Sequence, residues 1–225
     1  MRGKGFSIFE RVIAVSETTE GCLLYLITPD RIDDLDDFAA KLDEALSAGE
    51  VACVQLRLKG AEDDEIIQAA EKLMPIAHAH DAVFLINDRA DLAAKVDADG
   101  VHLGQDDGDV PSARTILGHG KDIGVTCHDS MHLAYKAGEE GANYVAFGAF
   151  FPSDTKDTEY KPDIDILTVW DEVTELPCVA IGGITPENCR ELADAGAHFV
   201  AACSSVWNHP DGPAAAVRAF TEALA

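Results

Sequence analysis

The sequence predicts a (β/α)₈ TIM barrel, formed as one domain with a short N-terminal extension. After residue 20, short apolar segments alternate with amphipathic stretches, and the pattern repeats eight times. Nearly continuous apolar segments are typical of parallel strands buried on both faces, and eight such repeats fit a barrel. No linker rich in Pro, Gly and Ser divides the 225 residues. We expect an extension over residues 1–20 and a barrel over residues 21–225, with a doubly wound open sheet as the main alternative.

The expected strands are short and nearly continuously apolar. In chain order they are Cys22–Thr28, Val51–Arg57, Ala82–Ile86, Gly100–Gly104, Asp122–Thr126, Tyr144–Gly148, Cys178–Gly182 and His198–Ser204.

The expected helices have apolar residues at helical spacing, and several begin with Asp, Ser or Thr followed by Pro or an acidic residue. Thr185-Pro186-Glu187-Asn188 is the clearest of these start signals. Phe6–Val15 of the extension is a further helix candidate, which would cover the bottom of the barrel. The others, in chain order, are Asp34–Ser47, Asp63–His80, Met131–Glu140, Pro186–Ala195 and Pro213–Ala225.

The charge balance argues against a nucleic-acid partner. The chain has 17 Lys and Arg residues against 41 Asp and Glu residues, a net charge of −24. Such a surface repels a phosphate backbone, so any phosphate site has to be built locally from a few cations and backbone N–H groups.

The cysteines and apolar runs indicate a cytoplasmic protein. No cysteine belongs to a C-x-x-C pair, and four of the six (Cys22, Cys53, Cys178 and Cys203) lie in expected strands. We interpret them as reduced core residues, neither a disulfide framework nor a zinc site. No apolar run reaches the roughly 18 residues of a membrane span, and no secretory signal is evident.

Two neighbouring strands end on carboxylates. Asn87-Asp88 follows the third strand and Gln105-Asp106-Asp107 follows the fourth. The carboxyl ends of barrel strands meet at one mouth, where active sites form. Mg²⁺ takes one or two carboxylates with phosphate and water oxygens, so we predict a Mg²⁺ site at Asp88 and Asp107. The alternative is structural: a helix cap by Asp88 and a turn at Asp106-Asp107-Gly108.

The end of the second strand carries two cations. Strand alternation places Gln55, Arg57 and Lys59 on one side, which in a barrel is the lumen or the mouth. Inward-pointing cations need an anion, because an unpaired buried charge is costly. A diphosphate satisfies both; an ion pair with a neighbouring carboxylate is the alternative.

The fifth strand ends at Thr126-Cys127-His128. Thr126 is a candidate to hydrogen-bond a substrate. His128 is either a general base or a residue that opens the next helix, and we favour the structural interpretation for both Cys127 and His128.

The last three strands end in candidates for a second phosphate site. The polar loop after the sixth strand offers hydroxyl and amine donors, the seventh strand ends in a Gly-Gly pair that lets phosphate approach the backbone, and the eighth is followed by serines. Loops after strands seven and eight bind phosphate in many barrels. These candidates are Ser153, Thr155, Lys156, Gly182, Gly183, Cys203, Ser204 and Ser205.

Taken in order, the strand-end motifs resemble those of the thiamine-phosphate synthase (thiamine-phosphate pyrophosphorylase) family, over about residues 22–206. The matching segments are Leu24-Tyr25-Leu26-Ile27-Thr28, Gln55-Leu56-Arg57-Leu58-Lys59, Ile86-Asn87-Asp88, Gly100-Val101-His102-Leu103-Gly104-Gln105-Asp106-Asp107, Gly124-Val125-Thr126-Cys127-His128, Phe151-Pro152-Ser153-Asp154-Thr155-Lys156 and Ala180-Ile181-Gly182-Gly183-Ile184.

The resemblance implies a Mg²⁺-dependent transferase of thiamine biosynthesis. It joins hydroxymethylpyrimidine diphosphate to hydroxyethylthiazole phosphate, or to its carboxylated form, and releases diphosphate. For the first substrate, the resemblance implies that Gln55, Arg57, Lys59 and Asn87 hold the pyrimidine diphosphate, that Asp88 and Asp107 bind Mg²⁺, and that Thr126 replaces the usual Ser. For the second, it implies that Gly183, Cys203 and Ser204 bind the thiazole phosphate. It also implies that Ser153, Thr155 and Lys156 line a loop between the substrates. Arg57, Lys59, Thr126 and Lys156 are the expected catalytic residues.

Two other functions stay open. A related thiazole tautomerase shares the fold and the thiazole-phosphate half, would use His128 as a base and needs no Mg²⁺ site. A non-catalytic barrel that binds a thiamine precursor is the other. Retention of Asp88 and Asp107 favours the transferase. Both substrates are small phosphorylated molecules, no membrane partner is expected, and the sequence leaves monomer and homo-oligomer open.

Overall fold

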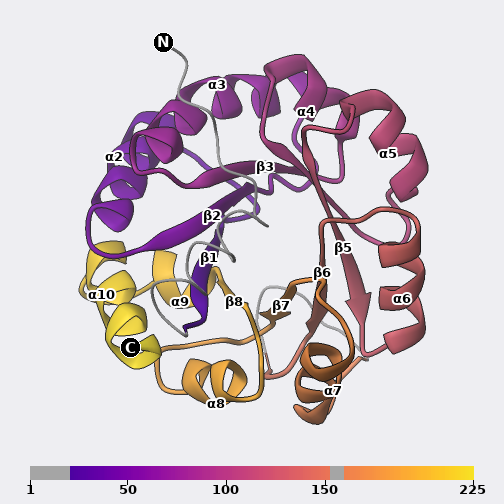
Figure 1. The fold of residues 1–225 in the computed structure, drawn as a ribbon. Coiled ribbons are helices and arrows are strands. Elements are labelled where there is room, and N and C mark those ends of the chain that lie inside the picture. Colours follow the sequence, from indigo (N-terminus) through magenta and orange to yellow (C-terminus); the bar gives the residue numbers. More distant parts are fainter. Residues whose placement is uncertain (1–20, 153–159) are drawn as a thin grey trace.

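The computed structural model, which describes residues 21–152 and 160–225, is a closed parallel barrel whose eight strands pair in chain order from β1 to β8 (Figure 1). Strand β8 pairs with β1, which closes the sheet. The strands are β1 Leu23–Ile27, β2 Val51–Leu56, β3 Val83–Asn87, β4 Gly100–Leu103, β5 Asp122–His128, β6 Tyr144–Gly148, β7 Cys178–Ile181 and β8 Phe199–Ala202. The predicted barrel is confirmed, and the open doubly wound sheet is wrong.

Helices surround the strands, and α10 lies beside α2 where the last repeat meets the first (Figure 1). They are α2 Leu35–Leu46, α3 Asp63–Ala79, α4 Ala90–Val96, α5 Val110–Leu117, α6 Met131–Glu139, α7 Asp165–Val173, α8 Cys189–Asp194, α9 Ser204–Trp207 and α10 Pro213–Leu224. Of these, α4, α5, α7 and α9 had no predicted counterpart.

One predicted helix start is wrong. Helix α8 begins at Cys189, three residues after Pro186. The Asn188 Oδ1 atom accepts a hydrogen bond from the Thr185 backbone N–H at 2.8 Å, and the Asn188 N–H donates to the Thr185 carbonyl at 3.2 Å. These local bonds hold residues 185–188 in a turn, so the helix begins after them.

The core has two layers, as expected for strands buried on both faces. In β1, Leu24 and Leu26 pack outward against the helices, whereas Tyr25 and Ile27 belong to the cluster that fills the barrel lumen. Where a strand ends, the same alternation places the side chain two residues beyond the last lumen position at the carboxyl-end mouth.

The remaining predictions on organisation have mixed outcomes. All six cysteines, each within the described residues, are free thiols, in agreement with the sequence. No helix in the described part of the chain is long and apolar enough to cross a membrane. The helix predicted at Phe6–Val15 and the boundary of the extension lie outside the described residues, so both stay predictions.

Candidate active site

A cavity of about 620 Å³ opens at the carboxyl ends of the strands. Most of the predicted site residues share its lining, although they come from six strands or the loops that follow them. They are Gln55, Arg57, Lys59, Asn87, Asp88, Asp107, Thr126, Gly182, Gly183, Cys203, Ser204 and Ser205. Ser153, Thr155 and Lys156 lie outside the described residues.

The Arg57 guanidinium forms an ion pair with Asp30, in the loop after β1. The Arg57 backbone N–H donates to the Thr28 hydroxyl at 2.9 Å, and the Lys59 backbone N–H donates to the Asp30 carbonyl at 3.0 Å. These bonds fix the end of β2 against the loop after β1. The sequence reasoning did not single out Asp30, although it too is a carboxylate that follows a strand.

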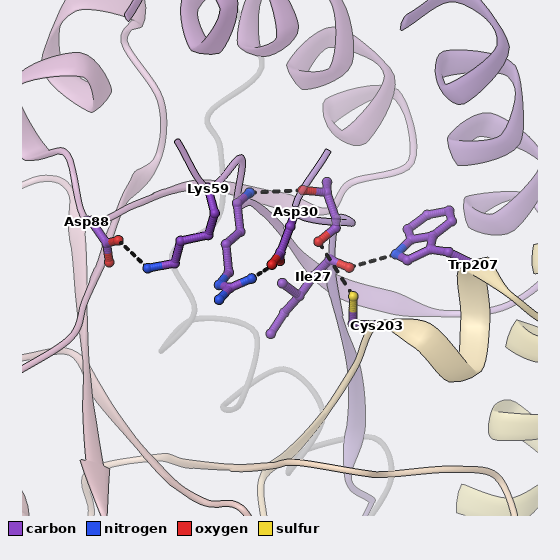
Figure 2. Close-up of polar contacts among 8 residues, drawn as sticks. Ile27, Asp30, Lys59, Asp88, Cys203 and Trp207 are labelled. Carbon is purple, nitrogen blue, oxygen red and sulfur yellow. Dashed lines mark hydrogen bonds and ion pairs between the residues drawn. The ribbon is translucent and has the colours of Figure 1, made fainter. Parts of the chain in front are cut away.

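Lys59 extends toward the third strand, where its Nζ atom lies 3.3 Å from Asp88 Oδ2 (Figure 2). Both cations at the end of β2 therefore have carboxylate partners, which is the ion-pair alternative left open by the sequence. The Lys59 side chain is half exposed, so this pair contributes little to stability.

Asp88 adopts a left-handed backbone conformation, with φ of 65°. Its N–H donates to the His102 carbonyl at 2.8 Å. Helix α4 is capped by Arg89 without a side-chain hydrogen bond, so the proposed helix-cap role for Asp88 is wrong. Burial raises the pKa of Asp88, and the adjacent Asp107 carboxylate raises it further against the opposing effect of Lys59.

Asp107 lies in the turn after β4, where its N–H donates to the Gly104 carbonyl at 3.3 Å. The cap of α5 is Asp109, not Asp107. A Cβ atom at Gly104 would overlap the Asp107 carboxylate, so glycine at this position leaves room for that carboxylate.

The donor set at Asp88 and Asp107 fits Mg²⁺. Two adjacent carboxylates, one with a raised pKa, form an oxygen-only site that a divalent cation would relieve of like-charge repulsion. The residues described include no group of three or more His, Cys, Asp or Glu side chains arranged for a metal. The other ligands of the cation would therefore have to come from substrate and water.

Gly182 and Gly183 have positive φ angles of 101° and 62°. Backbone N–H groups of Phe150 and Phe151 donate to the Ile181 and Gly182 carbonyls at 3.1 and 3.0 Å. A Cβ atom at Gly183 would overlap the Pro152 carbonyl oxygen. The glycines therefore let the loop after β6 pack on the end of β7, a requirement separate from phosphate binding.

The end of β8 is joined to the end of β1. The Cys203 thiol donates to the Thr28 carbonyl at 3.6 Å, and the Trp207 indole N–H donates to the Ile27 carbonyl at 2.6 Å (Figure 2). Burial raises the pKa of the Cys203 thiol to about 11, so it is not a thiolate. Within the described chain, the Ser205 hydroxyl is buried and has no hydrogen-bond partner.

Thr126 contacts a residue that the sequence reasoning did not single out. The His102 Nε2 atom lies 2.8 Å from the Thr126 hydroxyl, and both residues line the cavity. Burial lowers the pKa of His102 to about 4, so the imidazole is neutral at pH 7. The sequence could have indicated that His102 faces the lumen, because it alternates with outward-facing apolar residues in β4.

Of the two residues that follow Thr126, only His128 reaches the cavity. Cys127 is buried in the outer core, and burial raises its pKa to about 12, in agreement with a structural role. Helix α6 is capped by Ser130, so His128 does not open that helix as favoured. Instead its ring stacks on Tyr160 with 4.1 Å between centroids, and both line the cavity.

Fold and site together define a class: a (β/α)₈-barrel enzyme with a charged cavity at the carboxyl-end mouth. Within that class, a family model described as thiamine monophosphate synthase matches residues 24–206. The chain belongs to the thiamine monophosphate synthase family.

Individual relatives agree with this assignment. The chain is 56% identical to the thiamine-phosphate synthase of Rhodospirillum centenum over 203 residues, which cover 90% of this chain and 98% of the relative. It is 51% identical to that of Hyphomonas neptunium, with 88% and 91% covered. The solved thiamine phosphate pyrophosphorylase from Pyrococcus furiosus superposes with a TM-score of 0.79 at 31% identity, with 89% and 94% covered.

Proposed function

We propose that this chain joins hydroxymethylpyrimidine diphosphate to hydroxyethylthiazole phosphate, or to its carboxylated form, giving thiamine phosphate, diphosphate and, from the carboxylated form, CO₂. The family and its relatives support this reaction. The observation that carries it to the site is the juxtaposition, in one cavity, of two cations with two adjacent carboxylates: Arg57, Lys59, Asp88 and Asp107.

The reaction is a substitution at the pyrimidine methylene carbon. The bond from this carbon to the diphosphate oxygen breaks, and its electron pair leaves with the diphosphate. The thiazole nitrogen then forms a bond to the same carbon with its own lone pair. The aminopyrimidine ring can stabilise the intervening positive charge, so the enzyme needs no covalent nucleophile, and the cavity offers no thiolate.

Arg57 and Lys59 act on the leaving group. Each would leave its carboxylate partner and hydrogen-bond the diphosphate oxygens, where negative charge increases as the bond breaks. The loop after β1 holds the Arg57 backbone, so the guanidinium starts from a fixed position. Gln55, Asn87 and Thr126 would orient the pyrimidine between these cations.

Asp88 and Asp107 would hold the Mg²⁺ ion. When bound, Mg²⁺ supplies charge neutralisation at the diphosphate oxygens. Their shared position at the ends of β3 and β4 supports this role, as does the raised pKa of Asp88 next to a second carboxylate.

The other side of the cavity would hold the thiazole phosphate. Gly182, Gly183, Cys203 and Ser204 line it at the ends of β7 and β8, the usual phosphate position in such barrels. Ser153, Thr155 and Lys156 follow directly on the loop that packs against Gly183, and we assign them to the space between the substrates on the resemblance of their motif.

The alternatives have less support. A tautomerase would have no use for paired carboxylates beside two cations, and the relatives at 41–56% identity carry the synthase name. A cytoplasmic location stays a prediction from the sequence, and monomer and homo-oligomer both stay open.

The decisive experiment is incubation of the purified chain with both phosphorylated precursors and Mg²⁺, followed by detection of thiamine phosphate and diphosphate. Absence of both products from folded protein would contradict the proposal. Replacing Asp88 with alanine should reduce turnover by about a hundredfold or more while thiazole-phosphate binding persists. Asp194→Ala, on the exposed face of α8, is the matched control. Turnover that survives a chelator would refute the metal assignment alone.

A further inference from the structure

Along the floor of the cavity, five polar side chains form one continuous hydrogen-bonded chain across the barrel. Gln55 Nε2 donates to the Tyr25 hydroxyl at 3.0 Å, and this hydroxyl lies 3.0 Å from that of Tyr144. The Tyr144 hydroxyl is 2.8 Å from His102 Nδ1, and His102 Nε2 is 2.8 Å from the Thr126 hydroxyl. Four of the five are buried, and the chain ends at Thr126 on the cavity wall.

Strand register and one glycine create this chain. His102 in β4 is the register partner of Gly124 in β5, and Gly124 is the partner of Tyr144 in β6. A Cβ atom at Gly124 would overlap the Tyr144 phenol, so the missing side chain lets Tyr144 lean over β5 and reach His102. Tyr25 meets them from β1 because the barrel is closed. One hydrogen-bonded chain of polar side chains therefore crosses a lumen that is otherwise filled with apolar side chains.

The donors and acceptors along this path favour one direction. Gln55 donates to Tyr25, so the simplest arrangement has Tyr25 donate to Tyr144 and Tyr144 donate to His102 Nδ1, each phenol accepting once and donating once. In the reverse arrangement the Tyr25 oxygen would accept from both Gln55 and Tyr144. Its own hydrogen would then be left to the thiol of Cys53, which is a weak acceptor.

The favoured direction decides what Thr126 offers to a ligand. A neutral imidazole carries one hydrogen, so if Nδ1 accepts from Tyr144, Nε2 carries the hydrogen and donates to Thr126. The hydroxyl hydrogen of Thr126 is then available to the cavity. In the opposite tautomer that hydrogen would be used on Nε2, and Thr126 would present only a lone pair.

We propose that His102 is a positioning residue: held as the Nε2–H tautomer by Tyr144, it directs the Thr126 hydroxyl hydrogen into the cavity as a donor to the phosphorylated pyrimidine substrate. The inference rests on the proposed function for the identity of that substrate. The direction of the hydrogen-bonded chain does not depend on it.

The tautomer of His102 can be observed directly in the ligand-free protein. Long-range ¹H–¹⁵N correlation spectra of histidine-labelled protein distinguish the two neutral tautomers, and comparison with His102→Gln identifies the signal. We expect the Nε2–H form at pH 7. The Nδ1–H form or an imidazolium would overturn the proposal, whether or not the chain makes thiamine phosphate.

The kinetic consequence is tested by a double-mutant cycle under single-turnover conditions. Tyr144→Phe removes the donor to Nδ1 and should slow the reaction about tenfold, the size of one hydrogen bond. Tyr135→Phe, which removes an exposed phenol hydroxyl on α6, should leave the rate unchanged. In a Thr126→Val background, Tyr144→Phe should change the rate by less than about twofold, because its effect passes through Thr126.

Equal losses from Tyr144→Phe in both backgrounds would overturn the proposal, since Tyr144 would then act independently of Thr126. Far-UV circular dichroism and thermal unfolding check that the variants fold; if Tyr144→Phe does not, the tautomer measurement on the unmodified chain still decides. If the unmodified chain forms no product, the proposed function fails, and the spectra report on His102 separately.

Discussion

Replacing Gly183 with alanine tests how the loop after β6 is held on the barrel. The backbone at Gly183 has φ of 62°, and a Cβ atom would overlap the Pro152 carbonyl oxygen and crowd Phe151. A left-handed conformation costs alanine about 1 kcal/mol, and crowding in packed surroundings adds about 1–3 kcal/mol. We expect the free energy of unfolding to fall by about 2–4 kcal/mol.

The matched control is Gly141→Ala. Gly141 also has a positive φ, of 95°, but a Cβ atom there meets nothing within 4 Å. Urea denaturation should therefore show a loss of only about 1 kcal/mol for this variant. Only the Gly183 variant should also lower turnover, because the displaced loop leads into residues 153–159. Equal losses of stability in the two variants would refute the crowding argument.

Three further changes have defined outcomes. Because burial raises the pKa of Asp88, the metal-free native state loses stability as pH rises through that pKa. Asp88→Asn should therefore abolish turnover but raise the melting temperature at pH 7 in the presence of chelator. A lower melting temperature would contradict this. Trp207→Phe removes the donor to the Ile27 carbonyl and should lower the free energy of unfolding by about 1–3 kcal/mol; an unchanged urea midpoint would contradict it. A hydrogen bond to Asp99 raises the pKa of His78, so this ion pair stabilises the fold below about pH 6.5, and the stabilisation is lost as pH rises through the folded pKa. His78→Gln should therefore lower the free energy of unfolding at pH 6 and change it little at pH 9. An equal loss at both pH values would show that the ion pair is not responsible.

The strands and the mouth of the barrel were predictable because their signals are local. A parallel strand buried on both faces has a short apolar sequence, and the residue that follows it reaches the mouth. The rule predicts Asp88 and Asp107 at one mouth, and both line the same cavity. Applied to the first strand, the same rule would also have found Asp30.

What the sequence concealed depends on contacts between distant strands. Tyr144 has the pattern of a core aromatic residue, and only the register across Gly124 brings its hydroxyl to His102. Turn chemistry concealed smaller features: the Asn188 side chain competes for the backbone at residues 185–188 and delays α8 by three residues. Neither effect leaves a periodic signal.

The two ion pairs at the mouth, Arg57 with Asp30 and Lys59 with Asp88, make anion binding an exchange of partners. A singly charged anion such as chloride or acetate offers a cation no more than the carboxylate it would displace. A diphosphate carries several charges, so on the proposed function it would bind both cations and displace both carboxylates in a single event. The site would thus select its ligand by valence before shape is considered, against a net charge of −24 that repels every anion and a multivalent one most.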